Sequence, residues 1–479
     1  MRLIVLGLAI VAVALPASIA GAAEGGNLDT AFGAGTGKTV VDFEGDDVAR
    51  DLAVQPDGKI VVVGDYGTGP TTSDILVTRF NGDGSTDPTF AGGKALQIDL
   101  GKEDRAYAVA LQSDGKIVVA GVGQGNFIVL RVLPNGNLDS GFGDGGVVAT
   151  DFGRTEDRAF GLAIQSDGKI VAAGRTSVLP GPRDFALARY NPNGSLDASF
   201  GNGGTVRTDF GGDDRGEDVA IGPDGKIVVV GEQITPANAN AVARYNANGG
   251  LDASFDADGK VITDFGPTRD FPYGVVVQPD GKVVVSGETG GNFGVVRYGT
   301  DGQQDSGFAA GGRAITDAGG DDQGRDLALQ ANGKIVVVGP GGAAADFTFV
   351  RYRTDGSLDR SFGSGGIARA DFGNRDDANA VTVQSDGKIL AGGASITTGG
   401  DFAFARVLRG FCRVPNLVGT TLAAARASLA AAGCTLGSVG KAFSKKAKKG
   451  RIVSQRPRTG SQADEDGAVS VVVSRGRKR

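Results

Sequence analysis

An aspartate recurs at a fixed place in the chain, ten residues before each of seven short turns that read Asp-Gly-Lys or, once, Asn-Gly-Lys. The seven copies are Asp47, Asp104, Asp157, Asp214, Asp270, Asp322 and Asp376. Oxygen ligands suit Ca²⁺, so a ring of these carboxylates at the mouth of a channel would hold that ion. Each carboxylate also has the alternative of accepting a hydrogen bond from the backbone of its own turn, which explains the recurrence equally well.

The composition excludes several kinds of catalysis. The chain has no His, so it has no Ser-His-Asp or Cys-His machinery and no His-ligated metal. Paired carboxylates can hydrolyse glycosides, but seven equivalent copies single out no pair. With no Trp and seven Tyr, platforms for stacking sugars are few. We therefore expect no enzymatic activity.

The elements that position these aspartates form a sevenfold repeat. The turns lie 52 to 57 residues apart, and each unit, such as residues 159–211, contains four strand-like pieces. Asp-Gly between two such pieces is a strong hairpin signal. The strands alternate bulky and small apolar residues, which suits short sheets packed bulky face against small face. The pattern predicts a mainly β fold, with a seven-bladed β-propeller over residues 24–410. A linear β-solenoid is the alternative, but one coil of a solenoid usually has fewer residues than one of these repeats.

Pairs of opposite charge indicate how the ring closes. In six units an Arg on the third strand is followed eight residues later by an Asp, and the two face each other across a hairpin. These pairs are Arg79 and Asp87, Arg131 and Asp139, Arg189 and Asp197, Arg244 and Asp252, Arg297 and Asp305, and Arg351 and Asp359. The seventh, Arg406, lacks its Asp, while residues 28–32 are an orphan copy of the segment that carries it. We predict that Asp29 pairs with Arg406 and that the N-terminal strand completes the last blade.

The repeats resemble the delta-60 repeat family of bacterial extracellular proteins. The resemblance rests on the segments Asp209–Gly211, Gln165–Ile170 and Leu196–Gly204, and it covers about residues 27–408. It implies a propeller-like array and no activity. On a repeated frame we expect a specific site in the variable loops between second and third strands, such as residues 65–73 and 175–183.

The C-terminal part differs sharply in charge. Residues 412–479 contain 14 Lys and Arg but three Asp and Glu, although the whole chain has a net charge of −6. Seven of the cationic residues are Lys445, Lys446, Lys448, Lys449, Arg451, Arg456 and Arg458. Such a stretch attracts polyanions, and the attraction weakens with salt. Outside a bacterium these polyanions are phosphate-bearing wall polymers. A solvated basic face without a dedicated partner is the alternative.

Residues 411–479 are typical of a small α+β domain. The sequence predicts an extended entry at 414–419, a helix from Thr421 to Gly433, and strands at 451–455 and 468–474. Together with the turn from Pro457 to Gly460, these pieces resemble a PASTA domain. The resemblance implies a wall-linked protein, because the family is associated with peptidoglycan, kinase ectodomains and penicillin-binding proteins.

The N-terminus indicates export. Residues 1–23 are typical of a signal peptide, with Arg2, an apolar run from Leu3 to Leu15 and small residues after Pro16. A retained membrane anchor is the alternative, but this run is short for a bilayer, and no later segment is long and apolar enough to span one. An oxidising compartment favours a disulfide between Cys412 and Cys434 over two buried thiols.

These features predict a secreted, wall-associated and non-catalytic binding or scaffold protein. The propeller would present a surface to an unknown ligand or protein, and the PASTA-like module would hold peptidoglycan or an anionic wall polymer. Export argues against a nucleic-acid partner, and Ca²⁺ is the one cofactor that the sequence suggests. The alternative function is a secreted Ca²⁺-dependent hydrolase that acts on wall or extracellular polysaccharide.

Overall fold

The structure is a computed structural model, and it describes residues 25–43, 45–69, 72–177, 181–235, 238–264, 270–373, 375–396, 400–464 and 467–478. The predicted signal peptide, residues 1–23, lies outside these ranges. The described chain divides into two compact units, Gly25–Gly410 and a C-terminal unit that begins at Phe411. Within the described ranges, no helix has the length and apolar character needed to cross a membrane.

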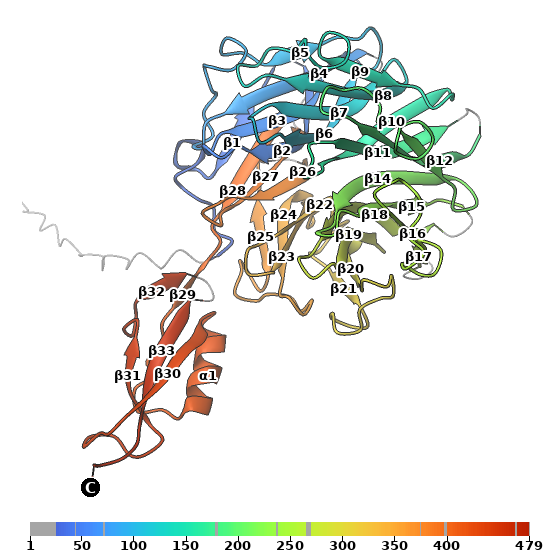
Figure 1. Cartoon of the computed structure of the whole chain (residues 1–479). Helices are drawn as coiled ribbons and strands as arrows, with labels where there is room; N and C mark the ends of the chain where they lie inside the picture. The colour runs from blue at the N-terminus through green and yellow to red at the C-terminus, as the bar shows by residue number, and fades with distance from the viewer. Residues whose placement is uncertain are drawn as a thin grey trace, which may run out of the picture. The chain divides into compact units, whose positions relative to one another are not determined.

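The first unit consists of seven four-stranded antiparallel sheets, the blades of a propeller (Figure 1). Blades 1 to 3 are formed by β2 (Asp46–Val54), β3 (Ile60–Gly69), β4 (Thr72–Phe80) and β5 (Leu96–Ile98); β6 (Arg105–Leu111), β7 (Ile117–Gly123), β8 (Asn126–Val132) and β9 (Val147–Thr150); and β10 (Glu156–Ile164), β11 (Ile170–Ser177), β12 (Arg183–Tyr190) and β13 (Thr205–Thr208).

The next three blades repeat this order. Blades 4 to 6 are formed by β14 (Asp214–Ile221), β15 (Ile227–Gln233), β16 (Ala239–Tyr245) and β17 (Lys260–Thr263); β18 (Asp270–Val277), β19 (Val283–Thr289), β20 (Asn292–Tyr298) and β21 (Arg313–Thr316); and β22 (Asp326–Leu329), β23 (Ile335–Gly341), β24 (Asp346–Tyr352) and β25 (Ile367–Ala370).

The seventh blade joins the two ends of this unit. It contains β26 (Arg375–Val383), β27 (Ile389–Ile396), β28 (Asp401–Val407) and, as its outer strand, β1 (Lys38–Val41), which follows a short 3-10 helix at Gly33–Gly35. Lys38 pairs with Ala405 and Val41 with Phe402 in an antiparallel register. The prediction of a seven-bladed propeller closed by the N-terminal strand is therefore confirmed.

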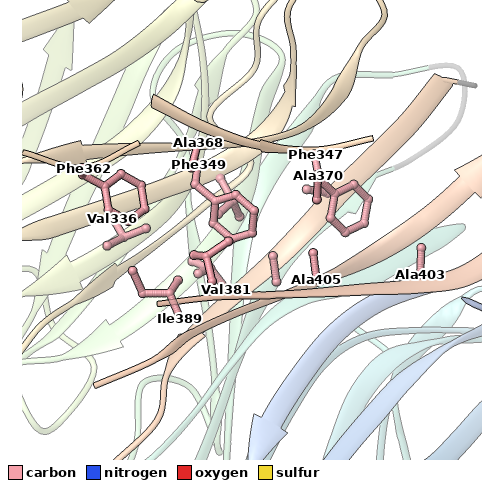
Figure 2. Close-up of a cluster of buried hydrophobic side chains, with 14 residues drawn as sticks. Val336, Phe347, Phe349, Phe362, Ala368, Ala370, Val381, Ile389, Ala403 and Ala405 are labelled. Atoms are coloured by element: carbon pink, nitrogen blue, oxygen red, sulfur yellow. The ribbon is translucent and has the colours of Figure 1, made fainter. Parts of the chain in front are cut away.

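The core lies between the blades, where bulky side chains meet small ones. Phe347 and Phe349 of β24 belong to the same fully buried cluster as Ala403 and Ala405 of β28, from the neighbouring blade (Figure 2). An alanine leaves room for a phenylalanine of the next sheet, so adjacent blades can approach closely without a void. The alternation of bulky and small residues along each strand is thus what allows identical units to stack in a ring.

The C-terminal unit is a small α+β domain. Its elements are β29 (Phe411–Arg413), α1 (Leu422–Ala431), β30 (Thr435–Ala442), β31 (Ile452–Arg456), β32 (Gln462–Asp464) and β33 (Ala468–Ser474). The Thr421 hydroxyl accepts a hydrogen bond from the Ala424 N–H at 3.2 Å and so caps the helix start. Cys412 and Cys434 are joined by a disulfide. The helix ends two residues before Gly433, whose φ of 68° is not helical.

Candidate functional site

The first strand of each blade presents one irregular residue toward the axis of the propeller. In six blades this strand has a β-bulge, where a single residue has no partner on the second strand. A bulge re-aims a side chain that a regular strand would direct into the sheet packing. The bulged residues are Arg50, Tyr107, Phe160, Glu217, Tyr273 and Asn379, and Arg325 holds the equivalent place before β22.

These seven residues line one cavity of about 240 Å³. Because the lining comes from the first strand of every blade or, for Arg325, from the residue just before it, the cavity lies in the central channel. The blades share one strand order, yet their seven residues here are of five different types. The backbone is repeated around the ring, but the side chains that line the channel are not. The channel therefore offers an asymmetric surface, as a specific binding site requires.

Arginine side chains lie over aromatic rings on this surface. The Arg50 guanidinium lies 5.6 Å from the centre of the Tyr107 ring, and the Tyr107 and Phe160 rings are 4.7 Å apart. Arg215 lies over Phe160 at 5.2 Å. Across the ring of strands, Arg325 lies over Tyr273 at 5.4 Å. Ion pairs add to these cation–π contacts, because Arg50 donates from Nε to Asp65 at 2.6 Å and Arg215 pairs with Glu217. The guanidinium groups are therefore held in place on the channel surface.

Three half-buried aspartates that line the cavity connect neighbouring blades. Asp51 accepts hydrogen bonds from the N–H of Leu52 and, on the next blade, of Val109, both at 2.7 Å. Asp218 and Asp326 repeat this arrangement in blades 4 and 6. Burial raises the pKa of Asp51 to about 7 and of Asp218 to about 6, and it raises the pKa of Asp326 as well. Their oxygens are thus engaged in holding the blades together.

The seven recurrent aspartates of the sequence do not line this cavity. All seven are fully buried where one blade passes to the next. Six of them accept a hydrogen bond from a backbone N–H four or five residues earlier in the same connection, for example Asp47 from Phe43 at 2.6 Å and Asp157 from Phe152 at 3.0 Å. Burial raises the pKa of Asp47 and of Asp214 to about 6. The structure therefore places these carboxylates separately, one at each junction, and gives six of them the backbone role that the sequence left as an alternative.

The paired charges of the repeat form a clip between blades. Arg79 donates from Nε to Asp87 at 2.6 Å, lies over the Phe90 ring at 4.9 Å, and donates from Nη1 to the Pro134 carbonyl of the next blade at 2.7 Å. The five other predicted pairs lie at 2.7 to 2.9 Å. The Lys of each Asp-Gly-Lys turn reaches the same carboxylate, as Lys59 does to Asp87 at 2.9 Å. These clips stabilise the ring.

The predicted basic residues of the C-terminal unit are at its surface. Lys445, Lys446, Lys448, Lys449, Arg451, Arg456 and Arg458 are all exposed. They come from β31 and from the segments on either side of it. The unit contains 14 basic residues against three acidic ones, so internal ion pairs cannot neutralise most of this charge. This surface is able to attract a polyanion.

The channel residues are the ones that sequence reasoning missed. A signal was present, because successive repeats read Arg, Tyr, Phe, Glu, Tyr, Arg and Asn at the bulge position. A position that varies inside a conserved repeat of one chain indicates specialisation. The residues that stand out in the sequence are those that the repeats share, and these residues stabilise the propeller.

Comparisons with known proteins support both units. The family described as "Domain of unknown function (DUF5122) beta-propeller" matches residues 55–90, 112–142, 165–200, 222–255, 278–308, 330–362 and 384–409, and the PASTA domain family matches residues 413–475. A probable serine/threonine-protein kinase of Clostridium acetobutylicum is 40% identical over 63 residues, which are 13% of this chain and 10% of the kinase.

Solved structures are similar at lower identity. A streptogramin B lyase structure has 10% identity and a TM-score of 0.48, and the match covers 78% of this chain and 97% of that chain. The three-PASTA-domain structure of a Ser/Thr kinase from Staphylococcus aureus has 25% identity and a TM-score of 0.13, over 13% of this chain and 32% of that chain. With seven matched repeats in seven blades and a matched C-terminal unit, the chain is a DUF5122 β-propeller protein that ends in a PASTA domain.

Proposed function

We propose that this protein is an exported, non-catalytic binding protein of the bacterial cell wall. In this proposal the PASTA domain holds anionic wall polymer or peptidoglycan, and the propeller binds a ligand in its central channel. The observation that carries the proposal is the exposed basic surface of the PASTA domain. The PASTA domain and its disulfide fit a protein that works outside the cell, at the wall.

The anchor rests on electrostatics. Lys445, Lys446, Lys448 and Lys449 are exposed within five residues of chain, and exposed Arg451 follows after one glycine. Positive charges gathered in this way attract the phosphate groups of wall polymers over roughly 10 Å at 0.1 M salt. Association through such a surface weakens as salt is added, whereas association through apolar contacts does not.

The contacts of the carboxyl groups in the channel support a binding role for it. Its cavity has room for a small molecule or for a side chain of a partner. The carboxyl groups that line it are already engaged, since Asp51, Asp218 and Asp326 hold backbone N–H groups and Glu217 is ion-paired with Arg215. A glycosidase needs two carboxyl groups free to reach one glycosidic bond. This supports binding as the role of the channel.

Co-sedimentation of the full chain with purified bacterial cell walls tests the anchor. The double variant Lys448→Gln/Lys449→Gln removes two charges from the basic surface. The control Lys94→Gln/Lys102→Gln removes the same charge from two exposed positions of the propeller. We expect the first variant to bind walls at least threefold more weakly at low salt and the second to bind like the unchanged protein. Equal binding by both variants would contradict the proposal.

A further inference from the structure

Three acidic side chains meet at the junction between blades 1 and 2. Asp74 lies on β4, Asp99 follows β5, and Asp104 precedes β6. One carboxylate oxygen of each lies within 4.8 Å of the other two. The same arrangement recurs at two further junctions, in the clusters Asp184, Asp209 and Asp214, and Asp346, Asp371 and Asp376. Blades 2 and 5 carry an amide at the first of these positions, Asn126 and Asn292.

Asp104 has a buried oxygen without a regular hydrogen bond. Its side chain is fully buried, and Oδ2 accepts the Leu100 N–H at 2.5 Å. Oδ1 is also buried, and it lies near the Gln124 N–H without forming a hydrogen bond of regular geometry. Burial raises the pKa of Asp104, and the charges of Asp99 and Asp74 add to this effect against the lowering by the nearby N–H groups of Leu100 and Gln124. A buried anionic oxygen of this kind is costly unless a cation compensates it.

The three clusters differ in how the protein itself compensates their charge. In the second cluster, Arg207 and Arg154 each form an ion pair with Asp184 at 3.3 Å. In the third cluster, Arg369 holds the place of Arg207 in the repeat, and its charge acts to lower the pKa of Asp346 although burial raises it overall. The first cluster has a neutral Gln97 at this place, which donates to Asp74 at 2.6 Å.

We propose that Asp74, Asp99 and Asp104 bind Ca²⁺. Two oxygens on one Ca²⁺ at 2.3–2.6 Å can be up to about 5.2 Å apart. The three oxygens of this cluster lie within 4.8 Å of one another, which is inside this reach, and carboxylate and water oxygens are the ligands that Ca²⁺ takes. Asp99 is exposed, so water completes the coordination from that side. The ion joins blade 1 to blade 2, with an affinity in the range of extracellular sites, about 10⁻⁴–10⁻³ M.

Equilibrium dialysis of the full chain against radioactive calcium, at constant ionic strength, counts the bound ions. Asp99→Asn removes one charge but keeps an oxygen that can accept the Gly101 N–H, as Asp99 does at 2.7 Å. Asp151→Asn is the matched control, because Asp151 makes the same bond to Gly153 at 2.6 Å beside Asn126. Gln97→Arg introduces the arginine that the two other clusters have.

We expect Asp99→Asn and Gln97→Arg each to lose one bound ion, or to bind it at least tenfold more weakly, and Asp151→Asn to bind as the unchanged protein does. Melting temperatures without calcium confirm that each variant is folded. The proposal is overturned if the unchanged protein binds no ion in millimolar calcium. It is equally overturned if Asp99→Asn and Gln97→Arg both retain every ion at full affinity, whatever other sites the protein has.

Discussion

Arg406 donates from Nε to Asp29 at 2.8 Å, across 377 residues of sequence, and both side chains are buried. The same guanidinium lies over the Phe32 ring at 4.7 Å and bonds to the Gly82 carbonyl of blade 1. Lys388 reaches the same Asp29 carboxylate at 3.1 Å. The clip found within blades 1 to 6 is thus rebuilt in blade 7 from the two ends of the unit, and it closes the ring.

Asp29→Ala should lower the free energy of unfolding of the propeller, because it removes the ion pair that closes the ring. The change leaves Arg406 buried without its carboxylate, which costs about 3 kcal/mol or more. Urea unfolding, followed by the far-ultraviolet signal of the propeller, measures the loss. Asp386→Ala is the control, because Asp386 is exposed and pairs with the same Lys388 at 3.3 Å; we expect less than about 1 kcal/mol there. Equal losses of unfolding free energy in the two variants would contradict a special stabilising role of the buried Arg406 and Asp29 pair.

Ala405→Leu should disturb the packing between blades 6 and 7. Ala405 is fully buried in the cluster that contains Phe349, and a leucine has no space there without displacing its neighbours (Figure 2). Overpacking of this kind costs about 1–3 kcal/mol. A lowered propeller melting temperature in calorimetry is the expected result. An unchanged melting temperature would mean that the side chains of neighbouring blades are not closely packed at this position.

Stability should fall as the pH rises from about 4 to about 7. Asp51 has its pKa raised from 3.8 to about 7, chiefly by burial, so the unfolded chain ionises it at lower pH than the folded chain does. Asp214 and Asp218, with pKa values raised to about 6, act in the same direction. Ionisation therefore favours unfolding across this range.

Melting temperatures measured in steps from pH 4 to pH 8 test this sign. Below about pH 4 the trend reverses, because the clip carboxylates have lowered pKa values, as Asp305 does at about 2, and lose their ion pairs on protonation. A melting temperature that rises steadily from pH 4 to pH 7 would contradict the raised pKa values of these three carboxyl groups.

Replacing Cys412 and Cys434 by Ala should weaken the PASTA domain alone. The disulfide closes a loop of 22 residues in a unit with a small core, and its removal costs about 3 kcal/mol. Calorimetry of the full chain should show the transition of the C-terminal unit at a lower temperature and the propeller transition unchanged. A shift of the propeller transition as well would mean that the two units do not unfold independently.

The sequence predicts the frame of this molecule better than its binding site. Features that repeat, such as the Arg79 and Asp87 pair, are visible because seven copies agree, and agreement is what builds a symmetric ring. The channel site depends on residues that differ from one repeat to the next, such as Tyr107 and Glu217. It also depends on a β-bulge, whose backbone geometry cannot be predicted from the residue types. The cluster at Asp74 depends on three chain segments that only the stacking of blades brings together.

Co-sedimentation of the two separate units with purified cell walls tests the central claim most directly. Residues 25–410 and 411–479 are each compact in the structure, so each can be prepared and compared with the full chain over a salt series. The account predicts that residues 411–479 bind walls as the full chain does, and that this binding fades as salt screens the basic surface. Binding that follows residues 25–410 instead would contradict the assignment of the PASTA domain as the anchor.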